Sequence, residues 1–119
     1  MRKILAGLVT GMALIATAAA ADDILTAGDL RDAIRGDGFS YRGVMRDGDS
    51  AIAFAEGYVA ALSTITEWCD PGIAPHEVLA RVYDRIDGLE AEAQDQPAEV
   101  AVAQTLQQLG PCNEDGQSE

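Results

Sequence analysis

Apolar residues recur at helical spacing in four segments of the chain, and no run alternates with period two for long enough to predict a strand. The clearest segment follows Asp49 or Ser50, either of which is an expected N-cap. Its spacings of four and three residues predict a helix of about 19 residues over 51–69. Gly57 lies inside it, and we expect a neighbouring helix to approach closely there. The expected inner face comprises Ala51, Ala55, Tyr58, Leu62, Ile65 and Cys69.

A shorter helix is predicted before this one. Thr26 has the position of an N-cap for a helix over 27–35, and Gly36 follows as its stop signal. Residues 36–50 then carry four Gly and three Asp without a sustained period. This composition predicts a loop.

Two more helices are predicted after the long one. The first opens with Pro75 at N1 and is ended or kinked by Gly88, and the second opens with Pro97 and is stopped by Gly110 and Pro111. Their expected inner faces comprise Leu79, Val82, Ile86 and Leu89, and then Val102, Leu106 and Leu109.

The predicted fold is therefore an all-α, small four-helix domain over residues 22–112. The long and last helices are expected to run parallel, with the third antiparallel between them. Residues 113–119 are polar and form a predicted tail.

The N-terminus has the pattern of a secretory signal peptide. Arg2 and Lys3 precede an apolar run, and small residues close it up to Ala21. We expect export to the periplasm with cleavage after Ala20 or Ala21, which leaves no integral membrane segment. The apolar run is shorter than the roughly 20 residues that a membrane anchor needs.

Cleavage after Ala21 changes the charge of the working chain. The full chain has 119 residues and a net charge of −12, and removal of residues 1–21 leaves 98 residues at −14, because two bases and no acids are lost. Such acidity argues against nucleic acid and anionic membranes as partners. A basic protein partner is favoured instead.

The two cysteines, Cys69 and Cys112, both lie in the mature part. An even pair in an oxidising compartment predicts one disulfide, which closes a loop of 44 residues. The chain-entropy model gives such a loop roughly 4 kcal/mol of stabilisation.

Candidate chemistry is sparse. His76 is the only histidine of the chain and is expected at the surface. Ser63 and Thr64 have no histidine within helical reach to act as a general base, so nucleophilic catalysis is not predicted. The chain has no C-x-x-C pair. Asp47-Gly48-Asp49 resembles the start of a calcium loop, but Tyr58 stands where its bidentate acid would be. The sequence predicts no enzyme activity, no metal site and no cofactor.

Two segments are candidates for protein binding. The 36–49 loop is expected to expose a mixture of aromatic, Met and Arg side chains that is typical of interface hot spots. These are Phe39, Tyr41, Arg42, Met45 and Arg46. The acidic stretch 84–95 is the second candidate, and the sequence also leaves a homodimer open.

The order of three short motifs resembles the Rap/Tai immunity-protein family. They are Gly57-Tyr58-Val59, then Trp68-Cys69-Asp70-Pro71, and finally Leu109-Gly110-Pro111-Cys112. The resemblance spans about residues 50–112, and Gly57, Tyr58, Trp68, Pro71 and Pro111 are its structural positions.

The resemblance implies a periplasmic protein that binds and blocks a peptidoglycan amidase toxin delivered by a type VI secretion system. It also implies the same Cys69–Cys112 disulfide. Relatives often carry a second cysteine pair, but Ala55 occupies the expected position of one of its members. No binding residue is carried over from the family.

An alternative function belongs to a different class. HdeA-type acid-stress chaperones of the periplasm are also small helical proteins with one disulfide, and they loosen at low pH to hold unfolding clients. Twenty carboxylates would turn a strongly negative chain positive on acidification. An exported helical protein with an unrelated protein partner is a third reading.

Overall fold

A computed structural model describes residues 24–112 of the chain. The predicted signal peptide and the polar tail lie outside these residues. The described part contains the four predicted α-helices and is mostly helical. They are α2 (Ala27–Arg35), α3 (Gly48–Ile65), α4 (Pro75–Asp87) and α5 (Ala98–Leu109), with a short 3-10 helix, η1 (Ala91–Asp95), between α4 and α5.

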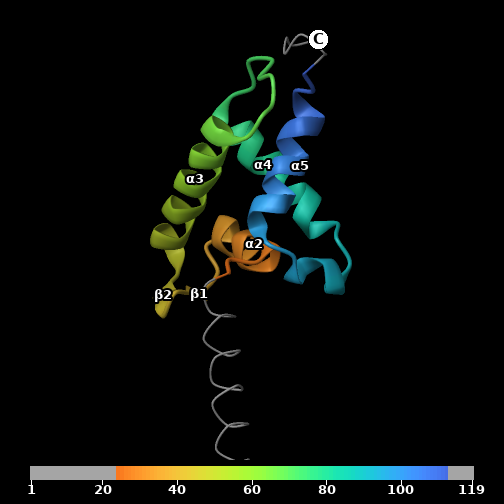
Figure 1. The fold of residues 1–119 in the computed structure, drawn as a ribbon. Coiled ribbons are helices and arrows are strands. Elements are labelled where there is room, and N and C mark those ends of the chain that lie inside the picture. Colours follow the sequence, from red (N-terminus) through yellow and green to blue (C-terminus); the bar gives the residue numbers. More distant parts are fainter. Residues whose placement is uncertain (1–23, 113–119) are drawn as a thin grey trace, which may run out of the picture.

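The helices surround one core. In Figure 1, α3 and α5 run in the same direction and α4 runs in the opposite one, as predicted. However, α3 also contacts α5 directly, so α4 does not separate them. Helix α2 lies at the end where α3 and α5 begin and touches all three of the longer helices.

The expected 36–50 loop is wrong in part, because it contains a β-hairpin. Strands β1 (Phe39–Tyr41) and β2 (Val44–Arg46) pair antiparallel, with Phe39 opposite Arg46 and Tyr41 opposite Val44. The two turn residues between the strands both have positive φ, 53° at Arg42 and 76° at Gly43, as in a type I′ turn. Three-residue strands are too short for their period to be visible in the sequence.

The long helix is shifted from its predicted position. It begins at Gly48, with Asp47 as N-cap, and ends at Ile65. Cys69 therefore lies outside it, contrary to the prediction. The buried face advances by four residues each time, through Ala51, Ala55 and Val59, and it leaves Ile65 78% exposed.

Gly57 lies on the outside of α3 and not at a helix crossing. It is exposed, and a Cβ built there would meet nothing within 4 Å. The expected close approach of another helix is therefore wrong. Gly57 therefore lowers the stability of the helix through its backbone entropy, and no packing contact offsets this cost.

We accordingly expect Gly57→Ala to stabilise the protein by about 1 kcal/mol. The gain comes from the lower backbone entropy of alanine in the unfolded chain. Chemical denaturation should show a higher midpoint with an unchanged m-value. A loss of stability would mean that this position packs against something in solution.

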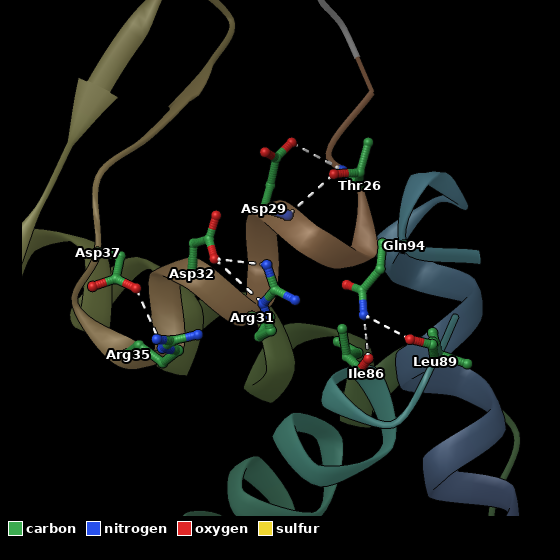
Figure 2. Close-up of polar contacts among 9 residues, drawn as sticks. All are labelled: Thr26, Asp29, Arg31, Asp32, Arg35, Asp37, Ile86, Leu89 and Gln94. Carbon is green, nitrogen blue, oxygen red and sulfur yellow. Dashed lines mark hydrogen bonds and ion pairs between the residues drawn. The ribbon is translucent and has the colours of Figure 1, made fainter. Parts of the chain in front are cut away.

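The start of α2 is fixed by a capping box, as the sequence predicted in part. The amide of Asp29 donates to the Thr26 hydroxyl at 3.1 Å, and the Thr26 amide donates to the Asp29 carboxylate at 3.2 Å (Figure 2). Gly36 ends the helix with a left-handed φ of 79°.

The N-terminal segment is tied to the chain before α5. Thr26 and Pro97 form an isolated antiparallel bridge, in which the Ala27 amide donates to Gln96 and the Ala98 amide to Leu25, each at 2.8 Å. Nearby, the Gln94 side-chain amide donates to the carbonyls of Ile86 and Leu89, which holds η1 against the end of α4 (Figure 2).

The core is built from small aliphatic side chains. Residues from all four helices are fully buried, among them Leu30, Val82, Ile86, Val102 and Leu106. The predicted inner residues Leu79 and Leu109 are only partly buried, because each helix is rotated slightly from the predicted face. Many alanines in the core let the helix backbones lie close together.

The predicted disulfide is present and closes the end of the domain opposite α2. Cys69 and Cys112 are bonded, with their Cα atoms 5.1 Å apart. Beside it, the Cys69 amide donates to the Gly110 carbonyl at 2.7 Å. The Trp68 indole NH donates to the Ser63 carbonyl at 2.9 Å, which folds the ring back over the end of α3.

Candidate protein-binding surface

Four aromatic rings from the hairpin and α3 form a continuous group, which we call the aromatic row. Phe54 lies at its centre, with ring centroids 5.2 Å from Phe39, 6.0 Å from Tyr41 and 6.0 Å from Tyr58. These separations and tilts are typical of attractive aromatic pairs. The row fixes the hairpin on the N-terminal half of α3.

Two arginines of the hairpin lie on rings of this row. The Arg46 guanidinium carbon is 4.9 Å from the centroid of Phe54, and that of Arg42 is 5.4 Å from Tyr41. Both contacts are in the range of cation–π attraction. The arginines are thus positioned before any partner arrives, which lowers the entropic cost of binding.

The hairpin also exposes apolar side chains. Met45 is 67% and Val44 is 48% exposed, a high fraction for such residues. Met45 and Ser40 face away from the aromatic row, since successive strand residues point to opposite faces. Phe39, in contrast, is only 4% exposed, so the expectation that the loop exposes it is wrong.

The structure thus brings together the five candidate residues but gives them different roles. Phe39 anchors the hairpin in the core, and Tyr41 is partly buried. Arg46 is partly buried as well, and Arg42 and Met45 are exposed to a partner. Phe54, which the sequence analysis did not select, contacts Phe39, Tyr41 and Arg46. Its position three residues after Ala51 could have predicted that it lies next to the inner face of the helix.

A hollow of about 240 Å³ adjoins the aromatic row where the chain enters α2 and α5. Tyr41 and Tyr58 line it, together with Ile24, which is 51% exposed, and Glu99. Burial raises the pKa of Tyr58 to about 12, with a further contribution from the negative charge of Glu99. The phenol therefore stays protonated and can donate a hydrogen bond.

This pKa predicts a pH dependence of stability. Because the folded-state pKa of Tyr58 lies above the ordinary value of 10, unfolding releases a proton between pH 10 and 12, and stability falls as the pH rises through that range. Absorbance at 295 nm should show one of the three tyrosines titrating near pH 12. Tyr58→Phe should remove that late titration, and the absence of any tyrosine titration near pH 12 in the native protein would contradict the assignment.

The second candidate segment is an open acidic surface. The five acidic side chains of 84–95 are all exposed, and no hydrogen bond or ion pair holds them within residues 24–112. His76 is exposed as well, as expected. In the described part of the chain no three His, Cys, Asp or Glu side chains gather as metal ligands, and no helix is long and apolar enough to cross a membrane.

The positions of the Rap/Tai resemblance fall into two places. Trp68 precedes Cys69 of the disulfide and lies against Gly110, whereas Tyr58 belongs to the aromatic row and Gly57 is on the exposed side of α3. Pro71 and Pro111 are exposed. No family model matches the chain, and no similar curated protein was found.

Proposed function

We propose that the chain is an exported protein-binding protein that acts as the Rap/Tai immunity proteins do. It binds a peptidoglycan amidase toxin delivered by a type VI secretion system, and it blocks that toxin in the periplasm. It performs no catalysis itself.

One observation carries this proposal. The second and third motifs of the resemblance lie far apart in the sequence, but their residues meet: Cys69 is bonded to Cys112, 43 positions away, and the Cys69 amide donates to the Gly110 carbonyl at 2.7 Å. Motifs that form one structural unit are a stronger basis for a resemblance than motifs scattered over the surface. The fold itself does not specify a function.

The hairpin supports the binding role. Two arginines held on aromatic rings, beside an exposed methionine, have the composition of interface hot spots. The acidic remainder of the surface favours a basic partner and would accelerate its approach.

The direct test is binding to the product of the adjacent gene. We expect that product to be a secreted hydrolase, and calorimetry should give a nanomolar dissociation constant and inhibition of its peptidoglycan cleavage. A neighbour that is no such hydrolase, together with no binding of any amidase of this class, would overturn the immunity role.

Substitution of the hairpin locates the contact. Met45→Asp should raise the dissociation constant about 30-fold or more, because it replaces an apolar contact by a carboxylate that loses its hydration in the interface. Ile65→Asp is the matched control, since Ile65 is 78% exposed at the other end of α3. Equal effects of the two substitutions would mean that the hairpin is not the contact.

An acid-chaperone role predicts a different outcome. Such a protein would lose its tertiary structure near pH 2 and would suppress the aggregation of client proteins there. The immunity role predicts no client protection at pH 2, which a light-scattering assay with a denatured enzyme would measure.

A further inference from the structure

A cleft lies between α3 and the start of α4, beneath the segment that joins them. It has a volume of about 160 Å³. Its walls are mostly apolar: Val59 and Ala60 come from α3, Trp68 and Ile73 from the connecting segment, and Val78 and Leu79 from α4. It lies away from the aromatic row, so it is not part of the surface described above.

Trp68 gives this cleft a fixed aromatic wall. The indole NH is already bonded to the Ser63 carbonyl, and the Ser63 hydroxyl donates to the Val59 carbonyl at 2.8 Å. The polar atoms of this wall are therefore satisfied, which leaves the apolar part of the indole for contact with a ligand. Tryptophan is the side chain whose face attracts cations most strongly.

Acidic groups surround the opening. Glu56 and Asp70 both line the cleft, and both are exposed. One oxygen of Asp70 accepts from the amides of Gly72 and Ile73, at 2.8 and 3.1 Å, which fixes the carboxylate and leaves its second oxygen without a hydrogen bond within residues 24–112. No hydrogen bond or ion pair engages Glu56 within residues 24–112.

The start of α4 contributes little that would attract an anion. Pro75 has no amide hydrogen, and the amides of Glu77 and Val78 already donate to the Ala74 carbonyl. Of the first helical residues only His76 offers a free backbone donor, and Glu77 adds negative charge to the same turn.

We infer that the cleft is a site for one arginine side chain of the protein partner. The aliphatic stem would lie between Val59 and Leu79, and the guanidinium would lie on the Trp68 face, with Glu56 and Asp70 as its acceptors. A planar guanidinium suits both the stacking and the paired carboxylate contacts. This inference deepens the proposed function and rests on it only for the identity of the protein that supplies the arginine.

The cleft can be tested without that protein. Trp68 is the only tryptophan of the chain, so its fluorescence reports on this site alone. We expect n-butylguanidinium, which has the shape of an arginine side chain, to change the emission in a saturable way, with a dissociation constant on the order of millimolar. Its neutral isostere n-butylurea should bind at least about fivefold more weakly.

Two pairs of variants locate the binding. Glu56→Gln should weaken n-butylguanidinium about threefold, whereas Glu92→Gln, an equal change of charge at an exposed site of η1, should not. Ala60→Phe should fill the cleft and abolish binding. Ala61→Phe is its matched control, because Ala61 is the next residue of α3, is exposed and does not line the cleft.

Equal binding of the two probes, or equal effects within either pair of variants, would overturn the arginine site. Such a result would leave the measured affinity for the adjacent gene product unaffected. Conversely, if the protein binds n-butylguanidinium as expected but binds no amidase, the arginine site is supported and the proposed function is overturned.

Discussion

Replacement of both Cys69 and Cys112 by Ser is expected to destabilise the protein more than any other conservative change. The disulfide spans 43 positions, and the chain-entropy model assigns such a loop about 4 kcal/mol. For a domain of this size, that loss lowers the melting temperature by about 15 °C or more. Both cysteines are partly exposed, so the serine hydroxyls can remain hydrated and add little cost of their own.

A reductant provides the matched control for this variant. The native protein in dithiothreitol should melt at nearly the same temperature as the double variant, whereas the variant itself should not respond to the reductant. Differential scanning calorimetry measures both. If the double variant melts at the same temperature as the oxidised native protein, the 69–112 disulfide does not stabilise the fold.

Gly110→Ala is expected to have the second largest effect. A Cβ at this buried position would overlap the carbonyl oxygen of Cys69, and it would lie 2.8 Å from the carbonyl carbon of Cys69 and 3.0 Å from Cε3 of Trp68. The φ of −139° is one that alanine can adopt, so the cost is steric. Because the obstacle is backbone, we expect a loss of about 3 kcal/mol.

The same chemical change at Gly57 should have the opposite sign, which makes Gly57→Ala the control for Gly110→Ala. Urea denaturation of the two variants measures both effects. The emission of Trp68 should also shift in Gly110→Ala, since its ring is among the nearest neighbours of the new methyl group. Equal stability of the two variants would contradict the close approach of Cys69 to Gly110.

The helices could be predicted from the sequence because their ends carry strong local signals. Thr26 forms the capping box with Asp29, and Pro75 begins α4 as expected. Gly88 and Gly110 end α4 and α5. These signals act within one turn of the chain, so they need no knowledge of the tertiary structure.

The end of α3 could not be predicted in the same way. The apolar spacing continues to Cys69, but the chain leaves the helix at Thr66, where the backbone is extended. Two hydrogen bonds stabilise the extended backbone after α3: the Trp68 indole NH donates to the Ser63 carbonyl, and the Cys69 amide donates to the Gly110 carbonyl. The second partner is about 40 residues away, so a local pattern contains no sign of it.

The candidate surface was predicted in composition but not in arrangement. The sequence indicated the hairpin residues, of which Arg42 and Met45 are exposed and Arg46 is partly buried. It missed Phe54, because the predicted inner face of α3 ran through Ala51, Ala55 and Tyr58. The true face is displaced toward Val59, which turns Phe54 toward the hairpin.

The bridge between Thr26 and Pro97 has a consequence for the order in which the protein folds. Helix α2 is made first, but it buries its apolar face against α3, α4 and α5, and its entry is paired with residues 96–98. Its contacts with α4, α5 and residues 96–98 form only after loop closure over most of the described chain, whereas those with α3 need a much shorter loop. The core therefore cannot close around α2 until α5 is present.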